Sequence, residues 1–215
     1  MRKKPNLIPR MERCAEVQIK NPEDFRGKWR EVLPQCGGVY LELGCGKGRF
    51  TAETAKTIPD ILLVAVERVP DAMVIGMERV CAEEIKNVRF IDMDVARLTE
   101  VFGPGEVDRI FINFCDPWPK KRSAKRRLTS PLFLGIYRSI LKPGGEIRFK
   151  TDNLPLFEYS LETFAESGFE LSEITNDLHK EGVCGIMTDY EMKFYDQGLK
   201  INRCVATLPA GQKEE

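Results

Sequence analysis

The sequence predicts an α/β fold of the doubly wound kind, in which helices cover both faces of a mostly parallel sheet. Apolar runs with the length of strands recur at 39–43, 61–66, 88–93, 107–114 and 146–151. Stretches with helical spacing separate them, as at 71–86. The run ILLVAV at 61–66 is continuously apolar, which is typical of a parallel strand covered on both sides. Strands that alternate with helices favour right-handed parallel crossovers.

The predicted elements follow in regular order. The strand at 39–43 leads into a glycine turn and a helix through about Ile58. The strand at 61–66 precedes the helix at 71–86, and further helices separate the next three strands. A helix at 154–167 leads to a strand at 169–175, and a closing strand is expected at 200–208 after a short helix.

Residues 1–35 lack this periodicity, so we expect a basic N-terminal arm or helix there and a single domain over 36–215. The arm holds five cations, Arg2, Lys3, Lys4, Arg10 and Arg13. We expect Trp29 to anchor the arm by packing.

Composition excludes several classes. Lys+Arg and Asp+Glu both number 33, so net charge alone indicates no partner. The sequence offers neither an apolar run long enough to cross a bilayer nor an apolar signal region, which predicts no membrane contact. The seven cysteines are scattered without a CxxC pair, and one His is present. We therefore expect reduced thiols, a cytoplasmic location and no metal site.

The strongest motif is LELGCGKG at 41–48, directly after the first strand. Glycines at alternate positions let the backbone turn sharply against a ligand. A dinucleotide-binding loop would read G-x-G-x-x-G, but Arg49 stands at its third glycine, which disfavours a nicotinamide dehydrogenase. We predict cofactor contacts from Glu42, Gly44, Gly46 and Gly48; a turn without a ligand is the alternative.

Acidic residues end the next two strands. Glu67 lies about 20 residues beyond the glycine loop, where a carboxylate accepts hydrogen bonds from ribose hydroxyls. Asp94 and Asp92 are both placed to accept a bond from an adenine amine. Taken alone, Glu67 could instead be a solvated charge at the end of the strand.

The fourth strand ends in a stiff corner, Asp116-Pro117-Trp118-Pro119, followed by six cations within 120–127. An aromatic face beside cations is suited to an unpaired base. The alternative is a structural turn with a solvated basic loop.

This corner resembles the hallmark of the bacterial tRNA (guanine-N7-)-methyltransferases, which is similar to DPWPKKR-SA-KRR at 116–127. Three further matches stand in order: GKW at 27–29, FKTDN at 149–153 and TDYE at 188–191. Ser123 replaces the usual His, and Cys115 the usual Pro before the Asp. The resemblance covers nearly the whole chain and selects Asp94 over Asp92.

The resemblance implies a Rossmann-like class I methyltransferase fold with an antiparallel last strand, S-adenosylmethionine as cofactor and tRNA as partner. It implies cofactor contacts from Glu42, Glu67, Asp94 and Asp116. It implies substrate contacts from Lys120, Asp152, Thr188, Asp189, Tyr190 and Glu191. It also implies RNA contacts along Arg122, Ser123, Ala124, Lys125, Arg126 and Arg127. The modified base is the variable-loop guanine at tRNA position 46, and the chain is expected as a monomer or homodimer.

The chemistry is compatible with this composition. Guanine N7 carries a lone pair and no proton, so methyl transfer needs positioning rather than a strong base or a metal. Positive charge moves onto the purine, and Asp152 and Asp116 are the candidates to stabilise it. Lys120 could donate to guanine O6.

Other interpretations remain open. T-x-x-E at 188–191 is also a capping box, with Gly198 ending the helix. We expect His179 in a surface loop rather than in catalysis. The rival functions are an adenine or amide amino-methyltransferase, whose Asp/Asn-Pro-Pro-aromatic turn is matched incompletely here, and a non-catalytic RNA-binding module on a Rossmann-like scaffold.

Overall fold

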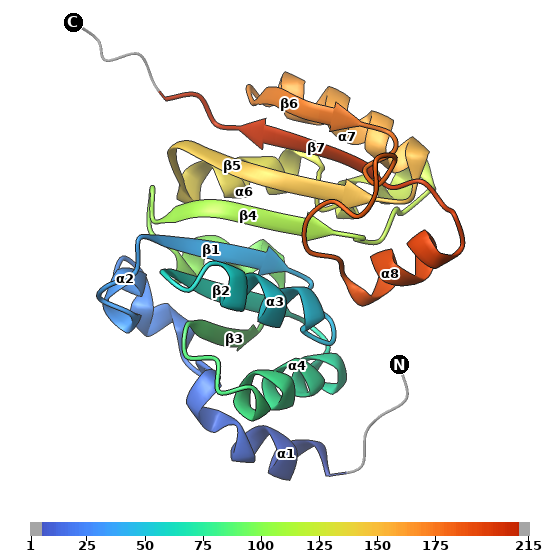
Figure 1. Cartoon of the computed structure of the whole chain (residues 1–215). Helices are drawn as coiled ribbons and strands as arrows, with labels where there is room; N and C mark the ends of the chain where they lie inside the picture. The colour runs from blue at the N-terminus through green and yellow to red at the C-terminus, as the bar shows by residue number, and fades with distance from the viewer. Residues whose placement is uncertain (1–5, 211–215) are drawn as a thin grey trace, which may run out of the picture.

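The computed structural model describes residues 6–210. Within this range seven strands form one sheet in the order β3-β2-β1-β4-β5-β7-β6 (Figure 1). The strands are β1 Gly38–Leu43, β2 Ile61–Glu67, β3 Val88–Asp92, β4 Val107–Asn113, β5 Leu141–Thr151, β6 Glu170–Thr175 and β7 Asn202–Thr207. Neighbours among β1 to β5 pair in parallel, while β7 is antiparallel to both β5 and β6. The predicted doubly wound sheet with an antiparallel last strand is confirmed.

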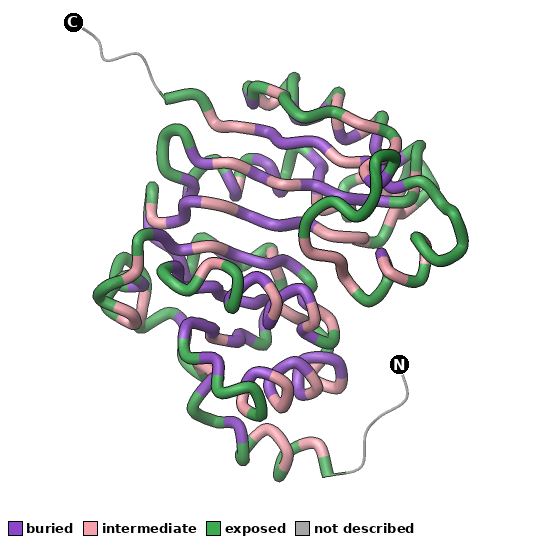
Figure 2. The backbone as a smooth tube through the Cα atoms, viewed as in Figure 1, coloured by how far each residue is buried: buried purple, intermediate pink, exposed green. Residues whose placement is uncertain are grey.

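Helices cover both faces of this sheet. They are α1 Leu7–Arg13, α2 Trp29–Val32, α3 Arg49–Thr57, α4 Pro70–Ala82, α5 Leu98–Val101, α6 Pro131–Ile140, α7 Leu154–Glu166 and α8 Asp189–Asp196, with the 3-10 turns η1 Ala15–Val17, η2 Pro22–Phe25, η3 Val95–Arg97 and η4 Lys121–Arg126. One apolar core lies under α5, α6 and α7, and the other under α3 and α4. Figure 2 shows that the buried stretches follow the central strands. In the described part of the chain no helix has the length and apolarity to span a bilayer.

Two element boundaries differ from the prediction by more than two residues. α4 ends at Ala82 instead of Lys86, because the chain turns back at Glu84, whose φ of 52° is left-handed and ends the helix. β5 begins at Leu141, five residues before the predicted strand, where it pairs with Val107 of β4. Both differences lie away from the carboxyl ends of the strands.

The segment before β1 packs onto the sheet domain. Trp29 is fully buried, its ring stacks on Phe102 at 5.0 Å, and its Nε1 donates to the Val101 carbonyl at 2.9 Å, which confirms its packing role. Arg10 donates to the Glu78 carboxylate through Nε at 2.7 Å, so α1 docks on α4. Arg2, Lys3 and Lys4 lie outside the described residues.

The order of the strands reverses between β1 and β4. Parallel sheets open a crevice for ligands at such a switch point, beyond the carboxyl ends of the strands. The glycine loop after β1, the acids after β2 and β3, and the Asp-Pro-Trp-Pro corner after β4 all emerge at this edge. α8 lies at the same edge, beside the arrowheads of β1 and β4 in Figure 1.

Candidate functional site: two adjoining cavities at the switch point

Two cavities adjoin at the carboxyl edge of the sheet. The larger has a volume of about 680 Å³ and lies over the ends of β2, β3 and β4. The smaller, of about 340 Å³, lies between the glycine loop and α8. Gly44, Asn113 and Phe114 line both. A ligand with two parts could therefore place one part in each cavity, with the two parts joined beside Asn113.

The glycine loop owes its shape to left-handed backbone. Gly44, Gly46 and Gly48 have φ of 78°, 55° and 71°, which side-chain-bearing residues rarely adopt. Gly44 lines both cavities and Gly46 the smaller one, and their contact with a cofactor stays a prediction. Gly48 lines neither cavity: a Cβ there would lie 2.5 Å from the Gly76 Cα in α4. Gly48 thus allows α3 and α4 to pack closely, and its contact with a cofactor stays a prediction.

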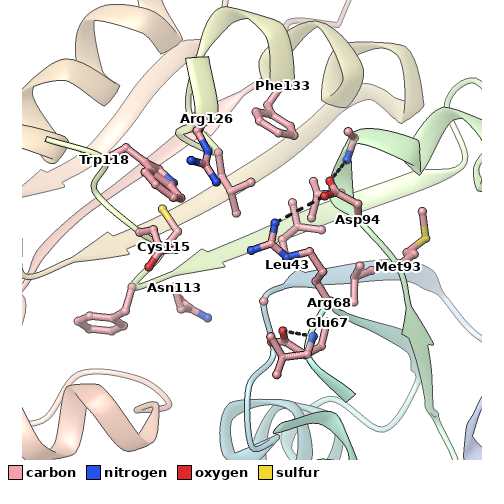
Figure 3. A pocket seen from close by; sticks show the side chains of 18 of the residues that line it. Leu43, Glu67, Arg68, Met93, Asp94, Asn113, Cys115, Trp118, Arg126 and Phe133 are labelled. Carbon is pink, nitrogen blue, oxygen red and sulfur yellow. Dashed lines mark hydrogen bonds and ion pairs between the residues drawn. The ribbon is translucent and has the colours of Figure 1, made fainter. Parts of the chain in front are cut away.

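The acids after β2 and β3 face the larger cavity (Figure 3). Glu67 accepts from the Gly46 N–H at 2.9 Å through one oxygen and from the Val69 N–H at 2.9 Å through the other. Asp94 accepts from the Ala96 N–H at 2.9 Å and lies 3.7 Å from Arg68. Both carboxylates are held in place with lone pairs left for a ligand. Asp92 lines neither cavity, in agreement with the choice of Asp94.

Glu42 is a buried carboxylate on the wall of the smaller cavity. It is 2% exposed, and the Thr51 hydroxyl donates to it at 2.5 Å. Burial raises the pKa of Glu42 to about 8, while the Thr51 bond and the Lys150 charge oppose this shift. A cationic ligand in this cavity would favour the ionised carboxylate.

The Asp-Pro-Trp-Pro corner is conformationally strained. Phe114, two residues before the corner, and Trp118, within it, have φ of 52° and 41°, a region that bulky residues avoid and that is often found at functional sites. Asp116 and Trp118 line the larger cavity. The Arg126 guanidinium covers one face of the Trp118 ring at 3.6 Å, so that face is not free for a base.

The basic stretch divides into two kinds of cation. Arg127 donates to the Pro117 carbonyl at 3.0 Å and to the Trp118 carbonyl at 3.1 Å, which fixes the corner. The exposed cations are Lys120, Lys121, Arg122, Lys125 and Arg126. Ser123 and Ala124 are partly buried in η4 between them. Lys120 lines neither cavity, whereas Lys125 and Arg126 line the larger one.

The first turn of α8 forms the opposite wall of the smaller cavity. Thr188, Asp189 and Tyr190 line it, and their contact with substrate stays a prediction. The capping box is also present, because the Thr188 hydroxyl accepts from the Glu191 N–H at 3.0 Å and Glu191 accepts from the Thr188 N–H at 3.2 Å. Arg49 lies 3.8 Å from Asp189 and joins this turn to α3.

Three predicted residues lie where the sequence did not place them. Glu191 is completely buried, so its expected contact with substrate is wrong. His179 is 8% exposed and 3.1 Å from Glu191, so its expected surface location is wrong too. Asp152 follows β5 at the same edge but is exposed and lines neither cavity.

Asn113 was missed by the sequence analysis. It ends β4, and both polar atoms of its side-chain amide are covered yet have no hydrogen-bond partner in the described structure. Such an amide indicates a ligand that supplies the missing bonds. The signal was a polar residue at the carboxyl end of an apolar strand at the switch edge. Within residues 6–210 no cluster of His, Cys, Asp or Glu could hold a metal ion.

These features fit S-adenosylmethionine. Glu67 and Asp94 offer acceptors for ribose hydroxyls and an adenine amine, and Gly44 and Gly46 leave open space where side chains would project. Glu42 and Asn113 offer an anion and an unpaired amide for the methionine end.

Fold and site together define a class I S-adenosylmethionine-dependent methyltransferase. A family described as "Putative methyltransferase" matches residues 37–204. The chain is 43% identical over 204 residues to the tRNA (guanine-N(7)-)-methyltransferase of Listeria monocytogenes serotype 4b (strain F2365), covering 94% of this chain and 95% of that one. It is 44% identical over 204 residues to the enzyme of that name from Bacillus subtilis (strain 168), covering 94% and 96%. The chain belongs to the family of tRNA (guanine-N7-)-methyltransferases.

Solved structures agree on the fold. The 16S rRNA methyltransferase KamB matches with a TM-score of 0.66 and 17% identity, over 85% of this chain and 93% of that one. The 16S rRNA (adenine(1408)-N(1))-methyltransferase from Catenulisporales acidiphilia matches with a TM-score of 0.62 and 13% identity, over 87% and 94%.

Proposed function

We propose that the chain transfers the methyl group of S-adenosylmethionine to N7 of a guanine in tRNA, the variable-loop guanine at position 46. Family membership supports the reaction. One observation carries the assignment of the site. A cavity large enough for a nucleoside adjoins a smaller cavity at Asn113, beside the Asp-Pro-Trp-Pro corner.

On the donor side, four residues have distinct roles. Glu67 accepts from the ribose hydroxyls, and Asp94 accepts from the adenine amine. Glu42, on the wall of the smaller cavity, pairs with the ammonium of the methionine part, and Asp116 contacts the cofactor from the wall of the larger cavity. When bound, S-adenosylmethionine supplies an electrophilic methyl group on a sulfonium.

On the acceptor side, Thr188, Asp189 and Tyr190 bind the guanine in the smaller cavity. N7 holds its lone pair in the ring plane, so alignment contributes most of the rate and no general base is required. A carboxylate near the purine stabilises the positive charge that develops. Asp116 and Asp152, which follow adjacent strands, are assigned this part, with Lys120 toward O6.

The exposed cations of η4 hold the RNA backbone. Arg122 and Lys125 lack the internal partners that occupy Arg127. Phosphate contacts of this kind position the RNA without reading its sequence. The proposal extends to a cytoplasmic monomer or homodimer that works without a metal.

The test is transfer of labelled methyl to tRNA, with a matched tRNA in which adenine replaces the variable-loop guanine. Label in N7-methylguanine from the first tRNA and none from the second is expected. Methylated adenine would instead indicate an amino-methyltransferase. Binding of tRNA without any methyl transfer would indicate a non-catalytic RNA-binding module.

The role of Asp152 is tested separately. Asp152→Ala should abolish transfer while leaving the affinity for S-adenosylmethionine within about twofold, because the residue lies outside both cavities and acts on the developing charge. Turnover at the wild-type rate in this variant would remove Asp152 from the mechanism.

A further inference from the structure

We propose that Lys150 and His179 are positioning residues that act through the carboxylate of Glu191. Together they fix the first turn of α8, and that turn is the guanine-side wall of the smaller cavity. The inference rests on the proposed function for the identity of the substrate, but the arrangement itself is a property of the free protein.

α8 has only a small apolar anchor, the half-buried Phe194, whose ring lies 5.9 Å from that of Phe114. Among its residues, Asp189 to Asp196, Glu191 alone is buried. Short helices derive most of their stability from burying an apolar face, and here the buried side chain is a carboxylate. Besides the Phe114–Phe194 contact and the Arg49–Asp189 ion pair, the position of α8 therefore depends on what holds that carboxylate.

The Glu191 carboxylate is fully engaged inside the protein. One oxygen accepts from the Lys150 ammonium at 2.5 Å and from the Thr188 N–H at 3.2 Å. The other lies 3.1 Å from Nε2 of His179. A carboxylate with no exposed surface and these three partners cannot also contact a base in the cavity. Its effect on substrate is necessarily indirect.

Lys150 is the link to the sheet. It lies in β5 in register with Asn113 of β4, is 8% exposed, and also donates to the Ile186 carbonyl at 2.9 Å. The lysine thus holds the chain both before and inside the first turn of α8. Burial lowers the pKa of Lys150, and the charge and hydrogen bond of Glu191 oppose that shift. The two charges therefore need each other, since a buried ion without its partner is strongly unfavourable.

His179 holds the other side of the same carboxylate. Its Nδ1 accepts from the Cys184 N–H at 3.1 Å, so in the neutral ring the proton is assigned to Nε2, which donates to Glu191. Its ring also meets Tyr195 of α8 edge-on at 5.2 Å. The imidazole therefore joins the loop at 179–184 to both ends of α8.

The experiment uses a matched pair at His179. His179→Gln can place an amide donor near the Nε2 position and keep the bond to Glu191. His179→Asn reaches only the Nδ1 position and loses it. A second pair, Lys150→Arg and Lys150→Met, keeps or removes the charge. For each full-length variant, amide hydrogen exchange over 186–196, the KM for tRNA and the affinity for S-adenosylmethionine are measured.

His179→Asn and Lys150→Met are expected to lose exchange protection over 186–196 and to raise the KM for tRNA about ten- to a hundredfold, as for loss of a hydrogen bond to a charged group. His179→Gln and Lys150→Arg should recover most of both. For the His179 pair the affinity for S-adenosylmethionine stays unchanged. If Lys150→Met does not fold, the His179 pair still decides the matter.

Unchanged exchange protection in His179→Asn would overturn the proposal. So would a fall in kcat at constant KM, because that would place Glu191 in the chemical step. Hydrogen exchange is measured without substrate, so the exchange result does not depend on turnover. A failure of the wild-type protein to methylate tRNA would overturn the proposed function instead.

Discussion

Arg126 covers one face of the Trp118 ring, with its guanidinium carbon 3.6 Å from the ring centroid. The pair lines the larger cavity, so the aromatic face that the sequence offered to a base is partly taken by a cation of the same chain. A base that stacks here must use the other face or displace the arginine.

Arg126→Ala should uncover the Trp118 ring and shift its fluorescence to longer wavelength. The chain has two tryptophans, and Trp29 is fully buried, so the change reports Trp118. Arg126→Lys should restore the stacking only in part, because a lysine ammonium lacks the planar face of a guanidinium. Identical emission spectra for wild type and Arg126→Ala would show that the stacked pair does not form in solution.

Arg122→Gln combined with Lys125→Gln should weaken tRNA binding and reduce its dependence on salt. Each lost phosphate contact lowers the slope of log K against log salt by about 0.7 to 0.9. Lys56→Gln is the control, since Lys56 pairs with Glu53 and Glu83 at the end of α3. An equal slope in the double variant and the control would exclude η4 from RNA binding.

Arg127→Ala should instead lower the unfolding temperature, because Arg127 holds two carbonyls of the corner.

Affinity for S-adenosylmethionine should rise with pH up to about 8, because burial raises the pKa of Glu42 to about 8 and the ligand ammonium needs the ionised carboxylate. The stability of the free protein depends on pH in the opposite direction. A carboxyl whose folded pKa is raised stabilises the fold at low pH, and this contribution is lost as pH rises from about 4.5 to 8. Calorimetry in two buffers with different ionisation heats measures the proton released on binding. Glu42→Gln should bind without that release, and equal proton release in both proteins would contradict the role of Glu42.

Asn113→Ala should weaken S-adenosylmethionine binding about tenfold without lowering the unfolding temperature, because the amide has no partner to lose in the free protein. Asn87→Ala is a control of opposite character. Asn87 donates to the Ala55 carbonyl at 3.0 Å and to the Ile58 carbonyl at 3.3 Å, so its loss should lower stability and leave affinity intact. Stability lost at Asn113 with affinity retained would show a structural role.

The sheet and the glycine loop could be predicted because local signals determine them. Continuous apolar runs mark the parallel strands, and alternate glycines mark a turn that needs left-handed backbone. Glu67 followed because residues at the ends of parallel strands meet at one edge of the sheet, whereas the resemblance to a family selected Asp94 over Asp92 and supplied Asp116.

The remainder depends on contacts between distant segments. Glu191 is 41 residues from Lys150 and 12 from His179, and nothing local distinguishes a buried carboxylate from one that faces a ligand. The capping box at Thr188 was correctly predicted, yet it left open which way the Glu191 carboxylate faces. The packing role of Gly48 was missed for the same reason, since its neighbour Gly76 belongs to another helix.

The contact between Gly48 and Gly76 has a bearing on the shape of the smaller cavity. Because α3 and α4 touch there through backbone atoms, the glycine loop is packed tightly against α4 and has little room to move. The smaller cavity is thus bounded on one side by a loop packed tightly on α4 and on the other by the first turn of α8. A side chain at Gly48 or Gly76 would therefore push the two helices apart and change the shape of the cavity from outside it.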